Sequence, residues 1–340
     1  MKKILLLIVL ISNMILVYSQ TAIEHFDNGL IKMELGDDQG AIHDFSKAIE
    51  LEYNVAYINR GLCKMHLDDY NGAIQDFNIS IKSDSNKYKT NVLYFRGSCK
   101  NEIKDYKGAI QDYNKVIELN FSHKGAYHFR GRSKYNLGDY IGAIKDLNKA
   151  IEFESDNKSA SGAYFDRSRC KYNLGDYRGA IQDLNKVIMY NPQNKTSYYN
   201  RGTSKHNLGD YKGAIQDFNI AIKLDPEFKE IYFNRGLSKL ILENHRGAIE
   251  DFSIAIEFGI MLKTSYYNRG LSKLALKDHK GAIQDFNKTI QFDSKYKIAY
   301  FGRGICKYEL GDLDGACLDL SKAGEFGYSK AYDMIKELCN

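Results

Sequence analysis

The sequence lacks the short motifs that mark most catalytic and metal centres. It contains no His-Glu-x-x-His, no phosphate-binding loop, no pair of cysteines at zinc spacing and no Gly-x-Ser-x-Gly. The eight histidines are scattered, and none of them belongs to a recognisable catalytic set. These absences predict a protein that is not an enzyme and that holds no metal and no cofactor.

Charge blocks and long apolar runs are also missing from most of the chain. The 340 residues include 48 Lys and Arg against 43 Asp and Glu, a formal net charge of +5, without a block of one sign. Nucleic-acid binding is therefore not indicated. Beyond the N-terminal segment, no apolar stretch approaches the roughly 20 residues that a membrane-spanning helix needs.

The N-terminal segment differs from everything that follows it. Two lysines precede the apolar run Ile4–Val17, and Ser19 supplies a small residue at the end of the segment. This pattern predicts a secretory signal peptide that is cleaved after Ser19, so that the mature chain begins at Gln20 and is periplasmic or secreted. The competing interpretation is an uncleaved N-terminal anchor. The shortness of the run and Asn13 within it argue against an anchor.

What the sequence does contain is a repeat. The motif Gly-Ala-Ile-x-Asp occurs nine times, with Cys317 in place of Ile in the last copy. The copies begin at Gly40, Gly72, Gly108, Gly142, Gly179, Gly213, Gly247, Gly281 and Gly315. A period near 34 residues predicts one supersecondary unit stacked in a line, in place of a core that folds around a centre.

The segment Lys195–Pro226 shows how one repeat is built. Between Tyr211 and Leu224 the apolar residues follow the i, i+3, i+4, i+7 spacing of an amphipathic helix, which we call helix B. Gly209 suits a left-handed residue at the end of the preceding helix A, and Asp210 suits the N-cap of helix B. The equivalent caps are Asp37, Asp69, Asp105, Asp139, Asp176, Asp210, Asn244, Asp278 and Asp312.

Each repeat also places glycines inside its helices. The glycine of the motif lies within helix B, and another glycine follows an arginine in helix A, with Ser168 as the exception. An interior glycine costs roughly 1 kcal/mol relative to alanine. Because this cost recurs on helix B in all nine units, we expect the motif glycine to allow close approach of helix backbones.

This unit resembles the tetratricopeptide repeat (TPR), whose pattern is matched here by Tyr198, Gly202, Ala214, Phe218, Ala221 and Pro226. The resemblance covers about residues 21–325 and implies an all-α fold, a right-handed superhelical solenoid of antiparallel helix pairs. The sequence departs from the family pattern because the closing Pro is present only at Pro192 and Pro226, and because Leu147, Leu184 and Leu320 replace the aromatic residue of helix B.

The domain organisation follows from the repeat. Residues 1–19 are expected to be the signal peptide, 20–326 the nine repeats and 327–340 a capping helix that covers the last open apolar face. The approximate repeats are 21–53, 54–87, 90–123, 124–157, 161–194, 195–228, 229–262, 263–296 and 297–326.

The six cysteines do not suggest a disulfide framework. Four of them share one helix-A position, at Cys63, Cys99, Cys170 and Cys306, where other repeats carry serine. This position calls for a small, buried residue. Neighbouring helices are about 8–10 Å apart, which exceeds the Cα separation of a disulfide. Cys317 and Cys339 could meet if the last helix folds back, and the sequence leaves that pairing open.

Two charged ladders run along the array. The arginines are Arg60, Arg96, Arg130, Arg167, Arg201, Arg235, Arg269 and Arg303; the aspartates are Asp44, Asp76, Asp112, Asp146, Asp183, Asp217, Asp251, Asp285 and Asp319. The arginines could form an anion-binding stripe, but an arginine on a packing face needs a partner, which favours pairing with the aspartates of the adjoining helix. A lysine ladder from Lys32 to Lys307 is expected to extend along helix A with its ammonium groups in water.

The resemblance also implies where a partner binds, because helix A lines the concave face of TPR proteins. One stripe on this face is Phe26, Ile58, Tyr94, His128, Phe165, Tyr199, Phe233, Tyr267 and Phe301; the stripe seven residues further on is Met33, Met65, Asn101, Tyr135, Tyr172, His206, Leu240, Leu274 and Tyr308. Seven residues are nearly two helical turns, so both stripes share one face. They could form a groove for a peptide or pack against the neighbouring repeat, and the second stripe favours the groove.

The composition of this face changes along the chain. Its middle is polar, with Arg132, Asn136, Arg169, Asn173 and Asn207, and its C-terminal part is apolar, with Leu237, Leu240, Ile241, Leu271 and Leu274. We therefore predict an exported, non-catalytic scaffold that binds a peptide or protein segment along helix A. The alternatives are a glycan-binding module, in which Tyr and Phe stack on sugar rings, and a structural protein that associates with itself.

Overall fold

The computed structural model describes residues 20–82, 88–154, 156 and 158–339. Within these residues the secondary structure is helical, and no strand is present. The chain divides into two compact units, Met1–Leu174 and Gly175–Asn340, which are described separately below as unit 1 and unit 2. The predicted signal peptide, residues 1–19, lies outside the described residues.

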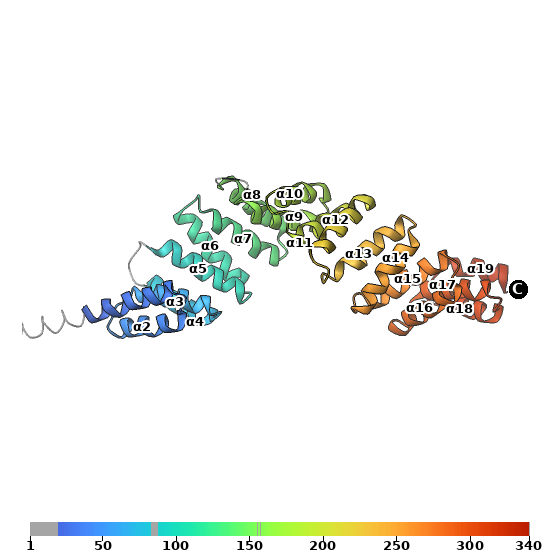
Figure 1. Cartoon of the computed structure of the whole chain (residues 1–340), viewed down its shortest axis with the longest axis horizontal. Coiled ribbons are helices and arrows are strands. Elements are labelled where there is room, and N and C mark those ends of the chain that lie inside the picture. The colour runs from blue at the N-terminus through green and yellow to red at the C-terminus, as the bar shows by residue number, and fades with distance from the viewer. Residues whose placement is uncertain (1–19, 83–87, 155, 157, 340) are drawn as a thin grey trace, which may run out of the picture. The chain divides into compact units, whose positions relative to one another are not determined.

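Unit 1 consists of helices that pack against their neighbours in chain order (Figure 1). Helical residues 20–34 come first. They are followed by α2 (Asp38–Glu50), α3 (Ala56–His66), α4 (Tyr70–Lys82), α5 (Lys89–Glu102), α6 (Tyr106–Leu119), α7 (Lys124–Asn136), α8 (Tyr140–Glu152) and α9 (Ser161–Asn173). In this unit the odd-numbered labels are helices A and the even-numbered labels are helices B.

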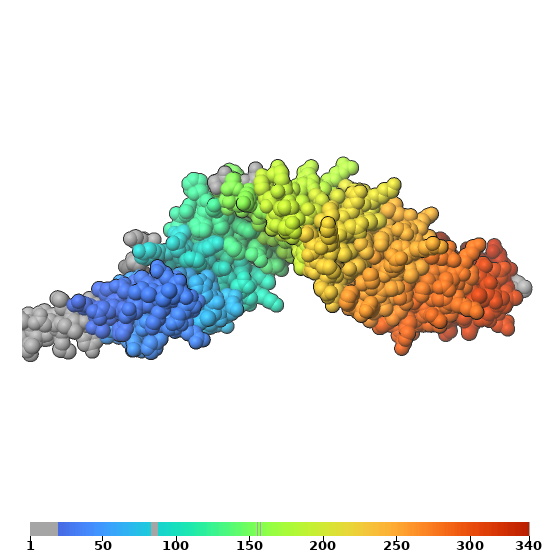
Figure 2. Space-filling model, viewed as in Figure 1, coloured from blue at the N-terminus to red at the C-terminus, as the bar shows by residue number. Residues whose placement is uncertain are grey.

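Unit 2 continues the same alternation. Its helices are α10 (Tyr177–Tyr190), α11 (Lys195–Asn207), α12 (Tyr211–Leu224), α13 (Glu230–Ile241), α14 (His245–Glu257), α15 (Leu262–Ala275), α16 (His279–Phe292), α17 (Lys297–Glu309), α18 (Leu313–Glu325) and α19 (Lys330–Leu338). In the space-filling view of Figure 2, the side chains of α13 to α18, coloured yellow to red, touch one another without a gap on the visible face. The predicted all-α stack of helix pairs is confirmed.

The predicted helix caps are present in every repeat. In α12 the backbone N–H of Gly213 donates a hydrogen bond to the carboxylate of Asp210 at 2.9 Å. The same cap occurs from Gly40 to Gly315, with donor–acceptor distances between 2.8 and 3.1 Å. Each cap satisfies one of the N–H groups that the first turn leaves without a helical partner.

The residue before each cap has the expected left-handed backbone, and glycine does not always supply it. Gly209 has φ of 90°, but Glu243 occupies the equivalent position with φ of 58° and Lys277 with φ of 63°. A residue with a Cβ in this region costs about 1–2 kcal/mol. These repeats therefore carry backbone strain that a glycine would remove.

Glu243→Gly should accordingly stabilise unit 2. We expect a gain of about 0.5–1 kcal/mol, because the relief of strain exceeds the extra entropy that glycine gives the unfolded chain. The shift in the midpoint of urea unfolding measures this gain. Gly209→Ala is the matched control and should shift the midpoint in the opposite direction; a shift of the same sign in both variants would contradict the explanation.

The two glycines of a repeat serve different purposes, and the close approach of helices predicted for the motif glycine occurs at the helix-A glycine instead. A Cβ on Gly202 of helix A would lie 2.8 Å from the buried ring of Phe218 and 3.2 Å from the carbonyl oxygen of Ala214, as expected for close packing of helices. A Cβ on Gly213 of helix B would instead lie 2.1 Å from a carboxylate oxygen of Asp210. The motif glycine therefore makes room for the cap and not for a neighbouring helix.

The small helix-A position is buried as predicted. Cys63, Cys99, Cys170 and Cys306 are fully buried and form no disulfide. Burial raises the pKa of each of these thiols to about 12, so they remain protonated and unreactive at neutral pH.

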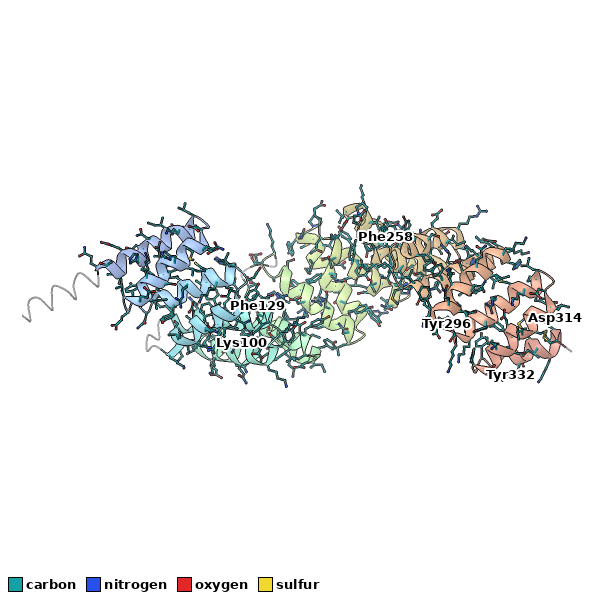
Figure 3. The ribbon with its side chains drawn as sticks, turned by 90° about the horizontal axis from the view of Figure 1, so that it is seen from below. Lys100, Phe129, Phe258, Tyr296, Asp314 and Tyr332 are labelled. Atoms are coloured by element: carbon teal, nitrogen blue, oxygen red, sulfur yellow. A yellow bond between two sulfur atoms is a disulfide. The ribbon has the colours of Figure 1, made fainter. Side chains whose placement is uncertain are left out.

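The C-terminal end is closed by α19. This helix packs against α18 and buries Ala331, while Tyr332, labelled in Figure 3, lies at the end of the unit. Cys317 of α18 and Cys339, the residue after α19, form a disulfide with a Cα–Cα distance of 5.8 Å. The last helix therefore folds back, and the pairing that the sequence left open is present.

Candidate functional site

The arginine ladder is a structural network. In unit 2, Arg235 donates from Nε and Nη2 to the two carboxylate oxygens of Asp251 at 2.9 and 2.6 Å. Its Nη1 donates to Asn219 of the preceding helix B at 2.7 Å. The paired residues are Arg60–Asp76, Arg96–Asp112, Arg130–Asp146, Arg201–Asp217, Arg235–Asp251, Arg269–Asp285 and Arg303–Asp319. The predicted pairing is confirmed, and the guanidinium groups of these arginines are not available to an anionic ligand.

The lysine ladder joins the same network, and the prediction that its ammonium groups lie in water is wrong. Lys239 Nζ is 2.9 Å from Asp251 Oδ2 and donates to the carbonyl of Gly247 at 3.3 Å. Equivalent lysine–aspartate pairs recur from Lys64 to Lys307. Each aspartate therefore faces two cations. Because the lysine follows the arginine by one helical turn, both side chains reach the same carboxylate.

The first stripe on the helix-A face mainly joins one repeat to the next. Tyr199 packs against Phe218 of α12 and Phe228 of the following loop, with ring centroids 6.1 and 4.9 Å apart. Its hydroxyl accepts a hydrogen bond from Asn234 of α13 at 2.8 Å. Tyr267 makes the equivalent contacts with Phe286 and with Tyr296, which is labelled in Figure 3. Both rings are partly buried.

Other members of the first stripe pack on rings of their own repeat or of the segment that follows it. Phe26 packs against Phe45, Phe233 against Phe252, and Phe301 against Tyr328. Ile58, Tyr94, His128 and Phe165 are likewise partly buried in unit 1. The sequence left packing and groove equally open for this stripe, and the contacts show that Phe26, Phe233 and Phe301, like Tyr199 and Tyr267, pack against other aromatic rings.

The second stripe is more varied. In unit 2, His206 lies 2.8 Å from the hydroxyl of Ser238, and burial lowers its pKa. Leu274 packs against the core formed by α16 and α17, whereas Tyr308 is exposed. Met33, Met65, Asn101, Tyr135, Tyr172 and Leu240 are partly buried. The members of this stripe therefore differ in burial, and the apolar groove expected in the C-terminal repeats stays a prediction.

The polar middle of the face contains a cluster in unit 1. Arg132 of α7 and Arg169 of α9 stand on either side of Asp166, with guanidinium-to-carboxylate distances of 3.6 and 3.7 Å. The imidazole of His128 makes the shortest contact with Asp166, at 2.9 Å. The guanidinium of Arg169 lies 4.3 Å from the centre of the Tyr135 ring. Three predicted site residues, Arg132, Tyr135 and Arg169, are thus brought together.

Sequence reasoning missed Asp166. This residue lies next to the ladder arginine, at the position that is Asn200, Asn234 and Asn268 in later repeats. The change from an amide to a carboxylate was the available signal. His128 and Asp166 are 38 residues apart in the chain and meet only because the period brings α7 and α9 into register.

A cavity adjoins this cluster. It has a volume of about 550 Å³ and is lined by Tyr94, His123, Lys124, His128, Phe153 and Ala163, among others. Gly125 also lines the cavity, and a Cβ at this position would lie 3.0 Å from the hydroxyl of Tyr94. His128 belongs to both the cavity and the Asp166 cluster.

Comparisons with known proteins agree with the geometry. Sequence profiles of the family described as tetratricopeptide repeat match residues 90–123, 125–157, 161–194, 196–228 and 264–296. The chain is a tetratricopeptide repeat protein. No curated protein sequence matches it.

Solved structures show the same TPR fold. A tetratricopeptide repeat protein from Parabacteroides merdae is 19% identical, with 74% of this chain and 97% of that chain covered and a TM-score of 0.52. The C-terminal part of a TPR repeat-containing protein from Cytophaga hutchinsonii is 18% identical, with 82% and 98% covered and a TM-score of 0.52. The Cut9–Hcn1 hetero-tetramer of the APC/C is 11% identical, with 94% and 76% covered and a TM-score of 0.50.

The TPR chain shows two further features within its described residues. No group of three or more His, Cys, Asp or Glu side chains there is placed to hold a metal ion. None of the helices in that part of the chain has the length and apolar character of a membrane span.

Proposed function

We propose that this TPR protein is an exported, non-catalytic scaffold that binds an extended protein segment along the helix-A faces of its repeats. The TPR fold supports a role in protein–protein interaction. One observation supports this particular face. The arginines and lysines of the two ladders are already paired with aspartates of the protein. The other side chains on helix A are therefore the ones left to contact a partner.

The observation that carries the proposal is a contrast between two sets of positions. The positions that hold the fold repeat almost without change, as the caps and the arginine–aspartate pairs show. The helix-A position two residues after the ladder arginine changes in chemistry from repeat to repeat. It is Leu62, Ser98, Arg132, Arg169, Thr203, Leu237, Leu271 and Ile305. A face that only held repeats together would be uniform, whereas a varied face can recognise a particular sequence.

Export is supported by two independent features. The N-terminal segment has the pattern of a signal peptide. The disulfide between Cys317 and Cys339 requires an oxidising environment to persist, which is the condition outside the cytosol.

One mass measurement checks both features. Protein purified from an exporting bacterial host without reductant should begin at Gln20 and should be lighter than the reduced chain by two hydrogen atoms. Thiol labelling in denaturant should then modify Cys63, Cys99, Cys170 and Cys306 only. A chain that retains Met1, or labelling of Cys317 and Cys339 as well, would contradict export.

Binding along helix A can be tested by blocking the face with bulky side chains. Full-length protein is panned against a display library of unstructured peptides, and affinities of the selected peptides are measured by fluorescence anisotropy. Asn136→Trp and Asn207→Trp place a large ring on exposed positions of α7 and α11. At least one of them should weaken binding by about tenfold or more, equivalent to about 1.4 kcal/mol.

The controls place the same ring on helices B. Gln182→Trp and Gln216→Trp alter exposed positions of α10 and α12, both helices B, and should leave affinity unchanged. Loss of binding only in these controls would move the site to helix B. If no peptide is selected at all, the proposal fails.

The glycan alternative is less well supported by the geometry. A sugar ring that stacked on Tyr135 would have to displace the guanidinium of Arg169, which already lies 4.3 Å from the ring centre. Self-association would appear as a concentration-dependent mass in light scattering without any added ligand. A result of that kind would favour a structural role over the scaffold.

A further inference from the structure

One part of the helix-A face in unit 1 has a chemistry that no other described repeat shares. At the position two residues after the ladder arginine, α7 carries Arg132 and α9 carries Arg169, where α3 carries Leu62 and α5 carries Ser98. Two adjacent repeats thus place an additional cation on the face. This pair does not belong to the arginine–aspartate network that holds the helices together.

The charge of this pair is only partly compensated. Asp166 supplies one carboxylate for two guanidinium groups, and its side chain is 11% exposed. The side chains of Arg132 and Arg169 are 49% and 41% exposed. Their distances of 3.6 and 3.7 Å to Asp166 exceed those of a hydrogen bond, whereas His128 contacts the same carboxylate at 2.9 Å. The arginine donors therefore remain available for a second acceptor.

The geometry also limits how the arginines can move. Arg132 lies over the Phe129 ring, labelled in Figure 3, with its guanidinium carbon 5.5 Å from the ring centre. Arg169 lies over Tyr135, whose hydroxyl accepts a hydrogen bond from Asn173 at 3.4 Å. Stacking on a ring reduces the entropy that a guanidinium loses when it binds, so the pair is partly preorganised.

The cavity next to the cluster adds a second element of recognition. His128 connects the two, because it contacts Asp166 and lines the cavity together with Tyr94, Phe153 and Ala163. The cavity has both apolar walls and the ion pair between Lys124 and Glu154, in which the charged atoms are 2.8 Å apart. Its cationic and anionic groups compensate each other, so the arginine pair dominates the local charge.

We propose that the Arg132–Arg169 pair binds an acidic side chain of an extended partner segment, and that the adjoining cavity receives an apolar side chain of the same segment. The inference rests on the proposed function, and it names the chemistry of the partner. Charge complementarity selects the occupant, because planar guanidinium forks match a carboxylate in geometry and charge. The position of the arginines on two successive helices A lets the segment continue past the pair in both directions.

Asp166 gives the proposal a test in which affinity should rise. This aspartate competes with the carboxylate of the ligand for the same two arginines. Asp166→Asn introduces the residue that later repeats carry, as at Asn200 and Asn234, and removes the competitor with little change in shape. It should therefore strengthen the binding of acidic peptides, an effect that a damaged fold would not produce.

The experiment uses full-length protein and an array of synthetic dodecapeptides that are acetylated and amidated, so that neither terminus is charged. Wild type should select peptides with Asp or Glu close to an apolar residue. Arg132→Thr with Arg169→Thr, which copies Thr203, should bind these peptides about tenfold more weakly or worse. Asp166→Asn should bind them more tightly, and replacing the acidic residue by its amide should abolish both differences.

A matched control removes the same number of charges elsewhere. Arg178→Thr with Arg246→Thr alters exposed residues of α10 and α14 and should leave selection unchanged. Selection without acidic preference, or acidic preference that survives loss of Arg132 and Arg169, would overturn this inference while leaving the proposed function intact. Failure of the wild type to select any peptide would overturn both.

Discussion

Replacement of Asp251 by Ala should destabilise unit 2 by about 3–5 kcal/mol. This carboxylate is almost fully buried and accepts two hydrogen bonds from Arg235, and Lys239 lies 2.9 Å from it. Its loss leaves two cations with low exposure and no anion between them. The loss of unfolding free energy then comes from uncompensated charge in a region of low dielectric constant. It exceeds the modest free energy that a surface ion pair contributes.

The effect can be measured by urea unfolding followed by circular dichroism, with hydrogen exchange to locate it. Because repeat arrays unfold in segments, we expect faster exchange in α13 and α14 before the rest of unit 2. Glu250→Ala is the control, since this exposed neighbour on α14 should change stability by no more than about 0.5 kcal/mol. Equal effects of the two substitutions would show that the network contributes little.

The second large effect concerns glycine in helix A. Gly202→Ala should destabilise unit 2 by about 2–3 kcal/mol, although alanine is the better helix former by roughly 1 kcal/mol. The added methyl would meet Phe218 at 2.8 Å and the Ala214 carbonyl at 3.2 Å. Neither neighbour can move easily, because the ring is fully buried and the carbonyl belongs to the helix backbone.

Gly213→Ala in the same repeat provides the comparison. The atoms nearest to its methyl would be those of the Asp210 carboxylate, which lies at the surface and can rotate away. The loss of the cap costs about 1 kcal/mol and the gain in helix propensity is of similar size, so the net change should stay within about 1 kcal/mol. Thermal unfolding of both variants separates the two roles; equal destabilisation would contradict the assignment of the motif glycine to the cap.

Much of the TPR fold could be predicted from the sequence because the same residue pattern recurs in every repeat. Asp210 and its equivalents predicted the caps, and the recurrence of an arginine on a packing face of helix A predicted its pairing with the aspartate of helix B. Both predictions needed only helical periodicity and the rule that a buried charge requires a partner. Periodicity did not reveal how far Lys239 reaches, so its contact with Asp251 was missed.

The candidate site was less predictable because it depends on contacts between repeats. The sequence placed Arg132 and Arg169 on one face, but it did not reveal that Asp166 lies between them or that His128 contacts it. Those contacts require the relative position of α7 and α9. The disulfide of Cys317 likewise depends on the direction in which α19 folds back.

The aromatic stripe shows a similar limit. Tyr199 and Tyr267 have the spacing of ligand anchors, yet their rings pack against the loop that leads to the next repeat. An amphipathic pattern cannot distinguish a ring that faces a groove from one that packs between two repeats, because both lie on the same side of the helix. The exposed polar residues of the face, such as Asn136 and Arg132, are therefore the better probes of binding.

The central claim is that a partner segment lies along helices A. Hydrogen–deuterium exchange of the full-length protein, with and without the peptide that binds most tightly in the display selection, tests it most directly. We expect slower exchange in helices A, foremost in α7 and α9, with helices B such as α6 and α8 unchanged. Protection confined to helices B, or spread evenly over the bound protein, would contradict it.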